Sequence, residues 1–323
     1  MGDSAQTRYL RLLGAPSAKA LEDRIVDTLL GAVRERQPSH ELPVRLSSVV
    51  NKFSIVPKPQ LVSGAHDGQI DYEKRGGRFV ITLCTPCPER PLREQPFRTR
   101  MRFTYAHEVA HRFFFVSERG TWTRARDVVT SSLPPAEELR QKVTLGRIEE
   151  SLCNSIARRV LIPDQALHDI ALDDWFREGI GFVHSLTMAA KRFGVSRDCL
   201  LVRLQLKTVD SPRFAFLIGK SRGTVLRRGN FGLRVITWLG PKKHAILSER
   251  RLHPGIEWAH FGTSACEFVE SCLKNEQRFE GAVSVPLETG KGTLQTFRGW
   301  WSVLKGRQQE RSRNRVLLWG EFV

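Results

Sequence analysis

Residues 107–111 read His-Glu-Val-Ala-His, and they lie within residues 97–119, a stretch rich in apolar side chains that contains neither Gly nor Pro. This composition predicts a buried helix. Because positions i and i+4 share one face of a helix, the imidazoles of His107 and His111 can reach the same metal ion. The carboxylate of Glu108 stands beside them, where the general base of such sites is found. The stretch therefore predicts a catalytic centre with one zinc ion.

A catalytic zinc ion usually has three protein ligands, so a further ligand must come from elsewhere in the chain. Metzincins supply a third His six residues after the second, but Ser117 occupies that position here. The alternative is a glutamate from a second helix. Glu150 and Asn154 would share one face of such a helix, so we expect Glu150 to bind zinc and Asn154 to hydrogen-bond His107 or His111. Glu149 would point about 100° away. An exposed acidic patch is the other interpretation of this segment.

Residues 1–210 are expected to form a mostly helical domain with a small β-sheet. Hydrophobic spacing predicts helices over 20–37 and from Pro43 onward, followed by an extended segment at 54–62. Residues 69–72 and 78–83 flank a turn that contains Gly76 and Gly77, which is typical of a β-hairpin.

The chain after the metal motif is expected to be irregular at first and then helical. Residues 117–132 are polar and read as an irregular insertion. A helix should start at Pro134-Pro135, and a helical pattern resumes from about Leu145 to Leu161 and stops before Pro163. Residues 186–204 have the pattern of a helix-turn-helix, which can read DNA, although we favour a packing role.

Residues 211–323 are expected to form a separate, β-rich α+β domain, with a boundary near Asp210. The strand patterns lie at 214–218, 233–239, 282–286 and 315–319, and a helix is expected at 267–273. This part of the chain holds 19 Lys and Arg against nine Glu and no Asp, which is more than half of the net charge of +17. A basic surface of this kind favours contact with nucleic acid or an acidic partner; a basic surface that only aids solubility is the alternative.

The composition also predicts where the protein works. No run of 18 apolar residues is present, so we expect no membrane span. The first residues lack the pattern of a secretory signal, and the six Cys are scattered, so we expect reduced thiols and a cytoplasmic location. Cys84 and Cys87 have the spacing of half a zinc ribbon, but no second such pair exists.

Taken together, two blocks of sequence resemble the ImmA/IrrE family of bacterial metallopeptidases. The first is Arg-Phe-Thr-Tyr-Ala-His-Glu-Val-Ala-His at 102–111, and the second runs from Glu150 through Asn154 and Ala157 to Pro163. The likeness covers roughly residues 43–205. It implies a zincin-like fold and a zinc-dependent endopeptidase that cleaves a regulatory protein, typically a helix-turn-helix repressor of a stress response or mobile element.

Such a reaction also needs a group that stabilises the oxyanion. Tyr72, Tyr105 and His184 are the candidates, and the sequence does not choose among them. The alternative function is a non-catalytic regulatory protein that binds nucleic acid or a partner and whose metal site is structural or degenerate. The intact Glu108 favours the protease, since a structural site does not need that carboxylate.

Overall fold

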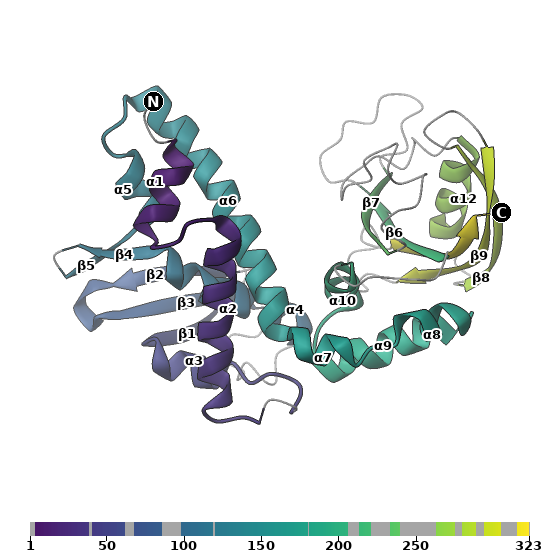
Figure 1. Ribbon diagram of the computed structural model, residues 1–323, viewed down its shortest axis with the longest axis horizontal. Coiled ribbons are helices and arrows are strands. Elements are labelled where there is room, and N and C mark those ends of the chain that lie inside the picture. The colour runs from purple at the N-terminus through teal and green to yellow at the C-terminus, as the bar shows by residue number, and fades with distance from the viewer. Residues whose placement is uncertain are drawn as a thin grey trace. The chain divides into compact units, whose positions relative to one another are not determined.

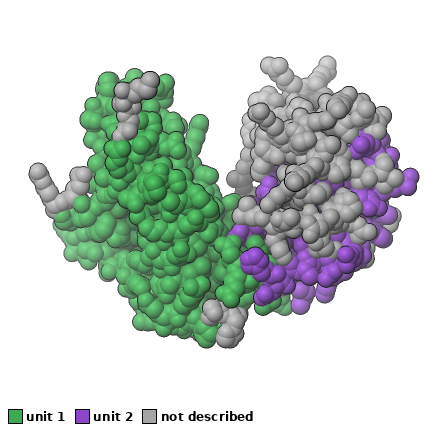
Figure 2. Space-filling model, in the orientation of Figure 1, with its two compact units in different colours: residues 1–167, 191–196 green, residues 168–190, 197–323 purple. Residues whose placement is uncertain are grey.

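The computed structural model describes residues 4–38, 41–61, 68–85, 98–118, 120–179, 181–205, 213–220, 233–239, 263–274, 280–288, 294–304 and 315–322. These residues form an α+β protein with two compact units. Figure 2 colours the first unit, residues 1–167 and 191–196, green and the second, residues 168–190 and 197–323, purple. Among the described residues, no helix has the length and apolarity that a membrane span would need.

The first unit begins with two capped helices, α1 (Ala5–Leu12) and α2 (Ala18–Arg34). Helix α2 matches the helix predicted over 20–37. The hydroxyl of Ser17 caps it by accepting a hydrogen bond from the backbone N–H of Ala20 at 3.1 Å. Its buried side chains recur every three or four residues, so one face of the helix is apolar: Leu21, Ile25, Val26, Leu29, Ala32 and Val33. A short helix, α3 (Ser47–Lys52), follows.

A three-stranded sheet with the order β1-β3-β2 lies beside these helices (Figure 1). Strands β2 (Gly68–Glu73) and β3 (Arg78–Thr85) are antiparallel and form the predicted hairpin. The extended segment is strand β1 (Ile55–Leu61), which pairs parallel with β3. Strand β2 is therefore an edge of this sheet.

The metal motif lies on helix α4 (Arg98–His111), which ends eight residues before the predicted stretch does. A 3₁₀ turn, η3 (Arg112–Phe114), leads into strand β4 (Phe115–Glu118). Strand β4 pairs with β5 (Thr121–Arg124), and helix α5 (Ala125–Thr130) follows. The expected irregular insertion is thus an ordered hairpin and helix. Its Thr and aromatic residues favour strands, and Gly120, with φ of +77°, adopts the left-handed conformation of the turn.

One long helix, α6 (Pro135–Leu161), runs alongside α2 in Figure 1. It starts and stops as predicted, with Glu137 and Glu138 in its first turn, where carboxylates favour the helix dipole. Near its other end, Arg159 Nη1 lies 2.9 Å from the carboxylate of Glu22 on α2. Helix α7 (Asp164–His168) comes next.

The second unit contains an antiparallel sheet with the order β7-β6-β10-β9-β8. The predicted strands are β6 (Arg213–Lys220), β7 (Leu233–Leu239), β8 (Glu280–Glu288) and β10 (Arg315–Phe322). The predicted helix is α12 (Thr263–Lys274). Strand β9 (Leu294–Leu304) was not predicted, since Gly299 interrupts its pattern. An apolar core joins α12 to the sheet and includes Phe214, Phe216, Val269 and Phe297.

Helices α8 (Leu172–Arg177), α9 (Gly181–Phe193) and α10 (Arg197–Leu204) explain why the units divide after Leu167 and not near Asp210. The ring of Phe182 stacks on Trp319 of β10, with 5.5 Å between centroids. The indole Nε1 of Trp319 donates a 2.7 Å hydrogen bond to the carbonyl of Gly179. Residues 168–190 therefore pack with the sheet, although their sequence pattern is helical like that of the first unit.

The predicted helix-turn-helix is present as α9 and α10. The connecting Gly194 has φ of +65°, which explains the glycine at this turn. No residue of α10 is exposed. A helix buried in this way cannot enter the major groove of DNA, so the packing interpretation fits the structure.

Candidate metal centre

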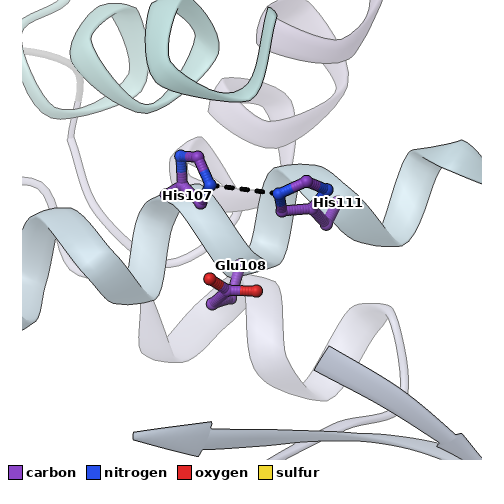
Figure 3. Close-up of side chains that lie close together, drawn as sticks. All are labelled: His107, Glu108 and His111. Atoms are coloured by element: carbon purple, nitrogen blue, oxygen red, sulfur yellow. Dashed lines mark hydrogen bonds between the residues drawn. The ribbon is translucent and has the colours of Figure 1, made fainter. Parts of the chain in front are cut away.

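Helix α4 brings the two motif histidines together on one face. The Nε2 atoms of His107 and His111 lie 3.0 Å apart, and their ring centroids are 4.7 Å apart (Figure 3). His111 is buried, and His107 is half-buried. The i and i+4 spacing thus gives two nitrogen atoms that point at one place.

Glu150, from α6, completes a group of three donors. One carboxylate oxygen lies 3.2 Å from His107 Nε2, and the other lies 3.3 Å from His111 Nε2. Hydrogen bonds to the two imidazoles hold the pKa of Glu150 far below its usual range. The carboxylate of Glu150 therefore faces both histidines.

The separations among these donors fit a zinc ion. A tetrahedral ion with ligands at about 2.0–2.1 Å separates its ligand atoms by about 3.3 Å. The observed separations of 3.0, 3.2 and 3.3 Å are close to that value. Burial opposes protonation of His111, but Cys153, Glu149 and Glu150 together raise the pKa of His111 to about 12. The same surroundings that attract a proton would attract a metal cation.

Glu108 is the other carboxylate within reach, since its oxygen and the donor nitrogens of both histidines lie within 4.8 Å of one another. It points to a different side of α4 from the line that joins the two Nε2 atoms (Figure 3). It is 7% exposed, and burial raises its pKa. Because Glu150 has the direct contacts with both imidazoles, the geometry favours Glu150 as the third ligand and leaves Glu108 for proton transfer.

The two histidines open onto a cavity of about 680 Å³. Strand β2 forms one wall with Gly68, Gln69 and Asp71. A side chain at Gly68 would collide with Thr104 of α4, because an added Cβ would lie 2.7 Å from its methyl carbon. Glycine thus lets the edge strand approach the metal helix closely. Three arginines also line the cavity: Arg100, Arg124 and Arg126.

The hydrogen bonds to the two histidine rings differ from those that were predicted. Asn154 lines the cavity, but among the described residues it makes no hydrogen bond to His107 or His111. Glu149 has that role instead, since its Oε1 lies 2.8 Å from His111 Nδ1. One signal could have found it. Glu149 lies in the apolar stripe of α6 that includes Leu145, Leu152, Cys153 and Ile156, and a charge in such a stripe needs a partner.

Neither Tyr72 nor Tyr105, two of the three predicted oxyanion stabilisers, lines the cavity. Tyr72 packs against Phe79 with centroids 5.1 Å apart. The hydroxyl of Tyr105 is buried without a hydrogen-bond partner, and burial raises its pKa. His184 is exposed and belongs to the second unit. The hairpin and α5, which were expected to be irregular, supply Arg124 and Arg126 to the cavity wall.

Other predicted features lie outside the described residues. They are Cys87 and many of the basic residues of 211–323, among them Arg222, Arg227, Arg228, Lys242, Lys243, Arg250, Arg251 and those of 305–314. Cys84 is half-buried in β3 with a free thiol. Among the described residues, no group of three candidate ligands lies away from this site, which holds His107, Glu108 and His111.

Comparison with known proteins finds distant similarity to solved structures. No family model and no curated protein matches the chain. A solved structure described as a Mycobacterium tuberculosis transcriptional regulator is 12% identical, with a TM-score of 0.46, and the match covers 99% of this chain and 82% of that one. The function of the site is therefore inferred from its own geometry.

Proposed function

We propose that this protein is a zinc-dependent endopeptidase whose zinc ligands are His107, His111 and Glu150. The observation that carries the proposal is the convergence of these three donors at separations of 3.0–3.3 Å, at an open cavity and beside a buried glutamate. When bound there, zinc would supply Lewis-acid chemistry at a substrate carbonyl and at water. A structural site would instead be closed by a fourth protein ligand.

Glu108 is the proposed catalytic base. Its carboxylate would take the proton from the attacking water and pass it to the nitrogen of the leaving amine. Burial favours the protonated form of a carboxyl group, so the raised pKa of Glu108 makes it a stronger base than an exposed glutamate. This fits a group that must both accept and return a proton.

Strand β2 is the proposed binding site for the substrate peptide. It is an edge strand, and its first residues line the cavity beside α4. An edge strand can bind an extended peptide through backbone hydrogen bonds. The guanidinium groups of Arg100, Arg124 and Arg126 are the cationic donors on the cavity wall, and they take the place of Tyr72 and Tyr105 as candidates for stabilising the oxyanion.

The proposed substrate is a regulatory protein, most simply a helix-turn-helix repressor of a stress response or mobile element, as the family resemblance implies. Contact with nucleic acid through the basic residues of 211–323 remains a prediction. A regulatory protein that binds its partner without cutting it is the alternative that the experiment must distinguish.

The test compares the full-length protein with Glu108→Gln and with the control Glu138→Gln, which changes a partly exposed carboxylate on α6. Loss of a general base should lower the cleavage rate by about 10²–10⁴-fold. Zinc content, measured by elemental analysis, should stay equal in all three proteins, and cleavage of an unbiased peptide library would be read by mass spectrometry. Normal cleavage by Glu108→Gln would refute the proposed mechanism. Zinc binding without cleavage by the wild type would favour the binding protein.

A further inference from the structure

Glu149 is a fully buried carboxylate with no exposed surface. An unpaired charge in such a place would cost several kcal/mol, so its partners must offset its desolvation. Two donors reach its Oε1 at 2.8 Å, namely His111 Nδ1 and Arg124 Nη1. The hydroxyl of Tyr9 donates to Oε2 at 3.2 Å, and Arg126 Nη1 lies 3.8 Å from Oε2. The carboxylate is therefore held by α4, β5, α1 and α5 together.

These contacts fix the proton of His111. A carboxylate in this network accepts hydrogen bonds and has none to give, so when His111 is neutral, as a metal ligand must be, its remaining N–H lies on Nδ1, toward Glu149. The lone pair then lies on Nε2, which faces His107 and Glu150. This is the tautomer that a metal ligand needs.

The two motif histidines differ in this respect. The Nδ1 atom of His107 is buried and has no hydrogen-bond partner in the described structure. The buried support of the site thus lies entirely on the side of His111. Tyr9 also suits this network. Burial and the nearby charge of Glu149 raise the pKa of Tyr9, so its hydroxyl stays protonated and can donate a hydrogen bond.

We infer that Glu149 is a positioning residue for the metal centre and that Arg124 and Tyr9 are its anchors. The inference rests on the proposed zinc site. It assigns a task to α1 and to the β4–β5 hairpin, neither of which contributes a metal ligand. Carboxylates that hold a ligating histidine typically change metal affinity by about 10–100-fold when they are replaced.

The experiment measures zinc affinity by competition with a chromogenic chelator, using full-length protein. Glu149→Gln keeps the size of the side chain and removes its charge, so we expect about 10–100-fold weaker binding. Glu138→Gln, on the same helix, should bind zinc as the wild type does. Replacing zinc by Co²⁺ adds a spectroscopic readout. Glu149→Gln should keep the wild-type cobalt spectrum at saturation, whereas loss of a ligand in Glu150→Gln should change it.

Tyr9→Phe covers the case in which Glu149→Gln fails to fold. It retains the ring, which stacks with Phe114 at 6.4 Å, and removes only the hydroxyl that reaches Glu149. It should weaken zinc binding in the same direction but less. Wild-type affinity in every variant of this network that folds would overturn the inference and leave the zinc site intact. A wild-type protein that binds no zinc would instead refute the proposed function.

Discussion

The described parts of the two units differ in the number and location of their buried polar side chains. In the described part of the first unit, seven polar side chains are buried, and three of them, Glu108, His111 and Glu149, gather at the candidate metal centre. In the described part of the second unit, two are buried, Arg203 and Ser302, and the sheet packs on α12 through apolar side chains. Buried charges lower stability unless they are paired, so their concentration in one place marks the site where function justifies that cost.

The largest expected effect that tests this contrast is that of zinc itself. With free zinc at about 1,000 times its Kd, binding should stabilise the folded first unit by about 4 kcal/mol. Hydrogen exchange, measured by mass spectrometry with zinc and with a chelator, should show the change in α4 and α6. Peptides from β9 and β10 serve as the internal control and should change little. Equal protection of both units would mean that they unfold together and that the contrast is not energetic.

A steric change within the second unit should have the opposite effect, since it should lower the unfolding free energy of that unit alone. Gly299 faces Gly320 across β9 and β10, and an added Cβ would collide with the carbonyl oxygen of Trp319. Because backbone atoms must move to relieve that collision, Gly299→Ala should cost about 1–3 kcal/mol or more in unfolding free energy.

The matched control is Gly31→Ala in α2, where an added Cβ meets nothing within 4 Å. Alanine in a helix interior should raise the unfolding free energy by about 0.5–1 kcal/mol. Chemical denaturation with zinc affinity as a second readout would separate the two variants. A Gly299→Ala protein that lost zinc binding while folded would contradict the independence of the units.

The smallest effect concerns the contact between residues 168–190 and the sheet. Trp319→Phe keeps an aromatic ring beside Phe182 but removes the hydrogen bond to Gly179, so it should cost about 1 kcal/mol. Trp300→Phe, at a partly exposed position, should cost less. Thermal unfolding of both variants provides the measurement. An unchanged Trp319→Phe protein would imply that residues 168–190 are not held by this contact.

Local periodicity predicted much of this fold because it reports which face of an element is buried. It gave the helices α2 and α6, the β2–β3 hairpin and four strands of the second sheet. It also placed Glu150 and Asn154 on one face of α6, since that inference needs only the geometry of one helix. Local periodicity could not predict the parallel pairing of β1 with β3, because partners that are distant in sequence leave no local pattern.

The features that the sequence analysis missed share a physical cause. The β4–β5 hairpin has a polar sequence, yet its Arg124 hydrogen-bonds a buried carboxylate. In the sequence, that carboxylate, Glu149, looks like an ordinary surface charge. Strand β9 contains a glycine that exists for a close backbone approach. The boundary between the units depends on a tertiary contact of Trp319. In each case, long-range contacts outweigh what the local pattern suggests.

Helix α6 carries both Glu149 and Glu150, and this has a consequence for how the site keeps its shape. Adjacent residues on a helix differ by about 100° in direction, so a turn of the rod about its own axis would misdirect both carboxylates at once. The bridge between Arg159 and Glu22 lies about 14 Å further along the same rod, given about 1.5 Å of rise per residue. It thus opposes rotation of α6, so that Glu149 stays directed toward the interior and Glu150 toward the cavity.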